Sequence, residues 1–157
     1  MIKVSPQENS LLSALFSRRG GKAWFATGMS FLGLDLLWLG MIGRPIYDRL
    51  LGDLLRPQAY VPAAILFYVF FVTTVVGYGV LGARSSREAM GRGGALGFVT
   101  YTTYELTNWA VIVGWPGLLV PMDITWGVFL TALASVTGYK ASSLPAGSES
   151  RSRETTQ

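Results

Sequence analysis

This chain of 157 residues contains neither cysteine nor histidine. Without thiols and imidazoles there is no disulfide, no thiolate nucleophile, no zinc site of the cysteine–histidine type and no imidazole acid–base catalysis. Any chemistry falls to carboxylates, hydroxyls, amides and arginine. We predict no metal site and no bound cofactor.

Charged residues are also scarce, at 14% of the chain against about 25% in a typical soluble domain. Half of the residues are hydrophobic, and much of this content falls in long blocks. The composition predicts an integral membrane protein with the lipid bilayer as its surroundings. A net charge of +4 could indicate nucleic-acid binding in a soluble protein. Here we assign the basic residues to the flanks of membrane spans and expect no nucleic-acid partner.

Four segments are long and apolar enough to cross the hydrocarbon core of a bilayer, which takes about 20 helical residues. They cover residues 23–43, 60–83, 93–113 and 118–139. We therefore expect an all-α fold in which residues 23–140 form a bundle of four transmembrane helices. Residues 1–22 would form an N-terminal arm, and the polar residues 141–157 a disordered tail.

The loop between the first two spans has a helical pattern of its own. Apolar side chains recur at positions 47, 50, 51, 54 and 55, with charged residues mostly off that stripe. This spacing predicts a short interfacial helix that lies on the outer surface of the membrane.

The distribution of lysine and arginine predicts the direction of the spans. Three of the 13 basic residues, Arg44, Arg49 and Arg56, fall between spans one and two. The other ten fall in the N-terminal arm, in the loop between spans two and three, and in the C-terminal tail. Because basic flanks stay on the cytoplasmic side, we expect both termini in the cytoplasm.

Three carboxylic acids, Asp35, Glu105 and Asp123, lie inside the predicted spans. A charge at the centre of a transmembrane helix costs at least about 2.5–3.5 kcal/mol on insertion scales, so such acids face protein or water, or find partners. At about 1.5 Å of rise per residue, all three fall in the outer half of the bundle. This agreement in depth suggests that spans one, three and four converge around a polar pocket that opens outward.

Helical spacing gives each acid a polar or aromatic companion. Trp38 and Trp126 each follow an aspartate by three positions, and Tyr101 and Asn108 share a face with Glu105. Arg44 is the nearest candidate cation, and Trp115 in the tight turn before span four would cover the pocket. The candidate pocket therefore consists of Asp35, Trp38, Arg44, Tyr101, Glu105, Asn108, Asp123 and Trp126. Alternatively, the acids form hydrogen bonds that only fix the register of the helices.

Small residues recur on the third span. Gly93 and Gly97 are four positions apart, in the segment GGALG. Glycines at this spacing let two membrane helices approach closely.

Several motifs are similar to those of a known family. The segments LDLLWLG, GALGFVTYTTYELTNWAVIVGWP and MDITWGVFLTALASVTGY resemble, in order, the small bacterial membrane proteins called domain of unknown function 2177. The resemblance covers about residues 23–140 and implies a four-span protein of the bacterial inner membrane, without implying an activity. Glu105 stands where the family typically has aspartate, which favours a proton or hydrogen-bond role over a strict metal geometry.

Three functions fit these observations. The first is binding or transport of a small cationic or amphipathic molecule in the acidic, aromatic pocket. The second is a membrane enzyme for a lipid or isoprenoid, with Asp35, Glu105 or Asp123 as general acid or base. The third is a structural partner, either in a homo-oligomer or in a larger membrane complex. Whether the protein is an enzyme stays open at this point.

Overall fold

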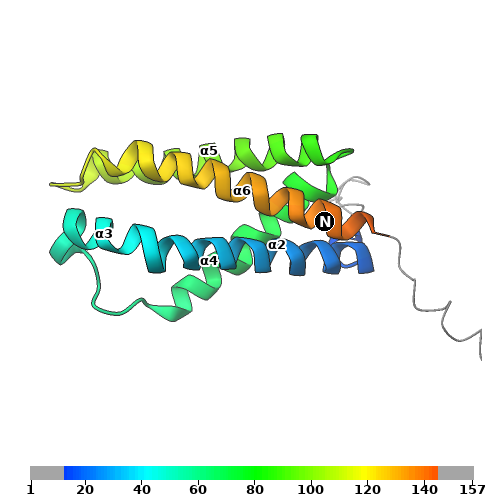
Figure 1. Ribbon diagram of the computed structural model, residues 1–157, viewed down its shortest axis with the longest axis horizontal. Helices are drawn as coiled ribbons and strands as arrows, with labels where there is room; N and C mark the ends of the chain where they lie inside the picture. Colours follow the sequence, from blue (N-terminus) through cyan, green and yellow to red (C-terminus); the bar gives the residue numbers. More distant parts are fainter. Residues whose placement is uncertain (1–12, 145–157) are drawn as a thin grey trace, which may run out of the picture.

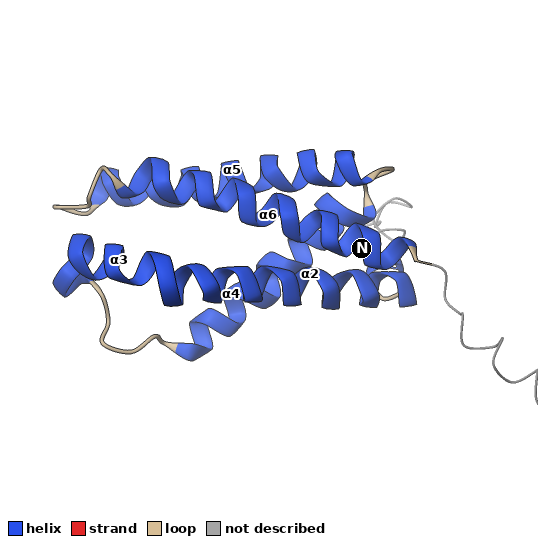
Figure 2. Ribbon diagram, in the orientation of Figure 1, coloured by secondary structure: helices blue, strands red, loops and turns tan. Residues whose placement is uncertain are grey.

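The computed structural model describes residues 13–144, and its regular elements in that range are all helical (Figure 2). The α-helices are α2 (Arg18–Leu37), α3 (Arg44–Leu51), α4 (Val61–Thr74), α5 (Ser86–Val111) and α6 (Leu119–Ser143). Two π-helices, η1 (Trp38–Gly43) and η3 (Val75–Leu81), and a 3-10 turn, η2 (Gly52–Leu54), extend them. The predicted all-α class is confirmed.

Side chains at the helix ends explain where several of these helices begin. The Ser17 hydroxyl accepts a hydrogen bond from the Gly20 backbone N–H at 3.0 Å, and thereby caps α2. Ser85 caps α5 in the same way, by accepting from the Glu88 N–H at 3.1 Å. Each serine satisfies one of the backbone donors that a helix leaves unpaired in its first turn.

Three helices of the described residues are long and apolar enough to cross a membrane: Arg18–Leu54, Val61–Leu81 and Leu119–Ser143. The helix α5, with 26 residues, is longer than α6 but does not reach the same hydropathy. Its first turns carry Arg87, Glu88 and Arg92, and Glu105 follows later. Glycines, threonines and Asn108 also interrupt its apolar stretch, and together with these charged residues they lower its hydropathy.

The first helix differs from our expectation for the loop between spans one and two. Residues 44–54 do not form a separate helix, because α2, η1, α3 and η2 run from Arg18 to Leu54 without a break, over 37 residues. Figure 1 shows α3 continuing α2 in nearly the same direction. Pro45 permits this continuation because it stands at the start of α3, where η1 replaces the α-helical hydrogen-bond pattern.

The predicted boundaries also shift at three places. The helix α2 begins at Arg18, inside the predicted N-terminal arm, and α5 begins at Ser86 rather than at residue 93. At the other end, α6 continues to Ser143, so residues 141–143 are helical rather than disordered. The remainder of the predicted tail lies outside the described residues.

Successive long helices run in opposite directions, so residues 18 and 143 lie at the same end of the bundle (Figure 1). The helix α6 packs along both α5 and α2. Its contact with α5 is close because Gly97 lies against the backbone of Gly127, and Gly93 lies against Ser135. The close approach predicted from Gly93 and Gly97 is therefore confirmed.

The apolar core lies between α2, α4, η3 and α6. One cluster contains Phe31, Phe71, Val75, Leu130 and Ala134, and a second contains Ala23, Val72, Val76 and Val80. Large apolar side chains also cover the outside, such as Phe70, which is 73% exposed. An apolar exterior of this kind suits a protein surrounded by lipid.

Candidate functional site

The three acids lie in the half of the bundle that is remote from residues 18 and 143. Asp35 comes from α2, Glu105 from α5 and Asp123 from α6. All three side chains are buried, with exposed fractions of 8%, 0% and 8%. Asp35 and Asp123 line a cavity of about 300 Å³, which we call the acid cavity. The common depth of the three carboxyl groups follows from the alternating direction of the helices.

Two tyrosines donate hydrogen bonds to the aspartates. The Tyr68 hydroxyl donates to Asp35 Oδ2 at 2.6 Å, and the Tyr47 hydroxyl donates to Asp123 Oδ1 at 2.6 Å. The indole N–H of Trp38 in turn donates to the Tyr47 oxygen at 3.1 Å. A carboxyl group in a low-dielectric environment needs such donors, and each aspartate here has one phenol.

Glu105 is paired on one side only. The indole N–H of Trp115 donates to Glu105 Oε2 at 3.0 Å. The other oxygen, Oε1, is buried and has no hydrogen-bond donor among the described residues. The carboxyl group of Asp123 is close enough to interact with that of Glu105. Two carboxyl groups can form a hydrogen bond with each other when one of them carries a proton.

Two tryptophans form one wall of the acid cavity. The rings of Trp38 and Trp126 are stacked, with their centroids 4.6 Å apart and an angle of 11° between their planes. Both residues follow a buried aspartate by three positions, so the repeated Asp-x-x-Trp pattern brings the two rings together across the bundle. Both tryptophans also line a larger apolar groove, so the acid cavity and this groove adjoin at the stacked rings.

Most of the predicted site residues are brought together. Asp35, Trp38, Tyr101, Asp123 and Trp126 line the acid cavity, and Glu105 adjoins it through Trp115 and Asp123. Trp115 itself also lines the cavity, as its position in the turn predicts.

Arg44 and Asn108 are the exceptions. Arg44 does not reach the buried acids, because its Nε forms an ion pair with Asp48 Oδ1 at 2.9 Å, and its side chain is 63% exposed. A partner four positions along the same helix needs no burial of charge, which makes it the easier choice for this arginine. Asn108 is half-buried, lies toward Tyr104, and is not among the lining residues.

Sequence reasoning misses the two phenols that contact the aspartates, Tyr47 and Tyr68. The sequence pattern places Tyr47 on the apolar stripe of a surface helix, and the predicted convergence omits the span that carries Tyr68. One signal is available, since a tyrosine inside an apolar segment usually needs a hydrogen-bond partner for its hydroxyl.

Basic residues are missing from the lining of the acid cavity, which contains no lysine or arginine among the described residues. The same part of the chain contains no group of three or more acidic side chains placed to hold a metal ion. The carboxyl oxygens are therefore met by hydroxyl and indole donors rather than by a protein cation.

A family model whose description is "Predicted membrane protein (DUF2177)" matches residues 21–140 of the chain. The chain belongs to this family. The match confirms the resemblance drawn from the motifs around the three acids, and the apolar helices of this DUF2177 protein agree with an integral membrane protein. No curated protein and no solved structure matches the chain.

Proposed function

We propose that this DUF2177 protein crosses the bacterial inner membrane four times, with both termini in the cytoplasm. Three apolar helices and the alternating chain directions support this topology. The fourth span lies within α5, whose 26 residues are about 39 Å long at about 1.5 Å per residue, enough to cross the hydrocarbon core. One side of α5 is buried against the other helices and carries Ala89, Gly93, Gly97 and Glu105. Glu105 therefore faces protein rather than lipid.

In this topology the acid cavity lies in the outward half of the bundle, and we infer that it binds a small organic cation or the cationic head of an amphiphile. The observation that carries the proposal is that two carboxyl groups, from α2 and α6, line one cavity, with the Glu105 carboxyl buried beside Asp123, and that the lining has no basic residue among the described residues. An unpaired ionised carboxylate in a buried site is costly, and a bound cation offsets that cost. The faces of the surrounding tryptophan and tyrosine rings also attract cations.

The size of the cavity limits the ligand. A volume of about 300 Å³ lies at the lower end of the range for small-molecule sites. The ligand of the acid cavity is therefore a compact amine or quaternary ammonium group rather than a large drug-like molecule.

The proposal can be tested by titrating purified protein with tetramethylammonium and following tryptophan fluorescence, since Trp38, Trp115 and Trp126 line the cavity. We expect Asp35→Asn and Asp123→Asn to weaken binding at least about tenfold, which corresponds to about 1.4 kcal/mol. Asp48→Asn is the matched control, because that acid belongs to an exposed ion pair on the same side of the membrane.

A structural role for the acids is the competing interpretation, and the tyrosine–aspartate hydrogen bonds favour it. If the two asparagine variants fold as well as the wild type and bind the probe equally well, the cation site is wrong. If they no longer accumulate as folded protein while Asp48→Asn does, the acids act mainly to hold the helices together.

A further inference from the structure

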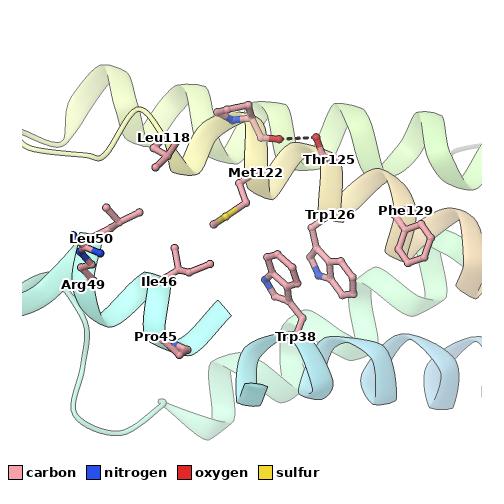
Figure 3. Close-up of a pocket in the computed structure, with 11 residues that line it drawn as sticks. Trp38, Pro45, Ile46, Arg49, Leu50, Leu118, Met122, Thr125, Trp126 and Phe129 are labelled. Carbon is pink, nitrogen blue, oxygen red and sulfur yellow. Dashed lines mark hydrogen bonds between the residues drawn. The ribbon is translucent and has the colours of Figure 1, made fainter. Parts of the chain in front are cut away.

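A second space, larger than the acid cavity, lies between α3 and α6. It is a groove of about 1210 Å³, which we call the lateral groove (Figure 3). Ile46 and Leu50 project into it from α3, and Met122 and Trp126 project from α6 (Figure 3). Its walls are almost entirely apolar, and the one hydroxyl in its lining, that of Thr125, donates to the Pro121 carbonyl oxygen at 2.7 Å within the described residues. The walls therefore suit an aliphatic chain.

The groove runs along the bundle from the outer end toward the middle. Leu118 and Arg49 lie at one end of it, and Phe129 lies at the other (Figure 3). From Leu118 to Phe129 the helix rises about 16 Å, at about 1.5 Å per residue. Half of a hydrocarbon core is about 15 Å thick. The groove thus matches the depth of one lipid leaflet.

The charged residue in the lining of the groove stands at its outer end. Arg49 is exposed, and it forms no ion pair within residues 13–144, whereas Arg44 on the same helix is paired with Asp48. From Arg18 to Arg49 the first helix rises about 46 Å, at about 1.5 Å per residue, which is about the thickness of a whole bilayer with its headgroups. Arg49, near the end of this helix, is therefore placed at the level of the lipid headgroups.

We propose that the lateral groove binds a membrane lipid with an anionic phosphate headgroup. The phosphate lies at the Arg49 guanidinium, and one acyl chain runs between α3 and α6 as far as Phe129. This site differs from the acid cavity, because the two linings have only Trp38 and Trp126 in common. The positive charge of Arg49 favours a headgroup with a net negative charge over a zwitterionic headgroup.

The test measures which lipids stay bound to the full chain. The protein is purified in detergent, incubated with equal amounts of phosphatidylglycerol and phosphatidylcholine, washed, and analysed by native mass spectrometry. We expect phosphatidylglycerol to be retained in preference, and Arg49→Gln to lower this preference about fivefold, as removal of one basic residue from an anionic membrane surface does. Arg44→Gln is the matched control and leaves the preference unchanged.

A second variant tests the apolar part. Met122→Trp fills the groove and should reduce the retention of both lipids, and Ile46→Trp does the same from the opposite wall should the first variant fold poorly. An unchanged phosphatidylglycerol preference in Arg49→Gln overturns the headgroup assignment. Equal lipid retention in wild type and in a folded groove-filling variant overturns the site. Cross-linking of two chains through the groove, without bound lipid, identifies a second copy as the occupant and also overturns it.

Discussion

The close contact between α5 and α6 makes one strong prediction, which concerns Gly97. A Cβ atom at this position would overlap the carbonyl oxygen of Gly127, and its next neighbours would be the carbonyl carbon of Gly127 at 2.9 Å and Thr131 Oγ1 at 2.9 Å. Ordinary contact begins at 3.4 Å, and the obstacle is backbone, which cannot rotate away. A Gly97→Ala substitution therefore forces the two helices apart.

The loss of stability expected for Gly97→Ala can be worked out by comparison with Gly91, which has open space around it. Overpacking a well-packed interior costs about 1–3 kcal/mol. Alanine also favours a helix over glycine by up to about 1 kcal/mol, which partly masks the clash. At Gly91, on the same helix, an added methyl group would meet no atom within 4 Å, so Gly91→Ala gains the helix preference alone. The difference between the two variants isolates the packing cost.

Thermal unfolding in a mild detergent, followed by circular dichroism, measures this difference. For a chain of this size a change of about 1 kcal/mol moves the Tm by about 2–4 °C, so Gly97→Ala should melt about 2–12 °C below Gly91→Ala. Equal melting temperatures for the two variants would refute the close approach of α5 and α6. The convergence of Glu105 with Asp123 would then lose its support, because these acids lie on the same two helices.

Two further predictions follow from individual contacts. Tyr68→Phe and Tyr47→Phe each remove the hydrogen-bond donor of a buried aspartate. Each should destabilise the protein by about 1–3 kcal/mol in thermal melts. Tyr60→Phe is the control because Tyr60 is 61% exposed, and the hydrogen bonds are contradicted if both cavity variants melt at the wild-type temperature. In the first turn of α5, on the N-terminal side of the predicted span 93–113, the Arg84 backbone N–H and then the Arg92 guanidinium hold the pKa of the Glu88 carboxyl below its usual range. A lowered pKa stabilises the fold above the unfolded value of about 4.3, and this contribution is lost as the pH falls through the folded value. Glu88→Gln should therefore melt below the wild type at pH 7, the gap should close in acid, and a gap that is independent of pH argues against this contact.

Much of the fold and part of the candidate site can be predicted from local rules. Apolar length locates the helices, and the rise per residue places Asp35, Glu105 and Asp123 at a common depth. The spacing Asp-x-x-Trp marks both tryptophans that line the acid cavity. These features depend only on the geometry of single helices.

The remainder depends on contacts between helices. Tyr68 reaches Asp35 because α4 packs beside α2, and no local pattern reveals that neighbour. The prediction that Arg44 faces the buried acids rests only on its distance from Asp35 along the chain. Asp48, with which Arg44 forms its ion pair, lies one helical turn away and is equally evident in the sequence. The predicted surface helix is present as α3 but is not confirmed as a separate element, since Pro45 suggests the first turn of a new helix and η1 carries the existing helix through it.

The winding of η1 has a consequence for the position of Tyr47. Asp35 and Tyr47 are 12 positions apart, which in an unbroken α-helix would leave their side chains about 120° apart around the axis, at about 100° per residue. Because η1 has wider i→i+5 turns, each of its residues rotates the chain about the helix axis by a smaller angle than in an α-helix. Over the whole segment the rotation falls short of that of an α-helix by roughly a quarter turn. Tyr47 thereby comes to within about 30° of the angular phase of Asp35, much as though one residue fewer separated them. A chain that lacked one residue of this stretch, and was wound as a plain α-helix throughout, would present the same phenol to the same cavity.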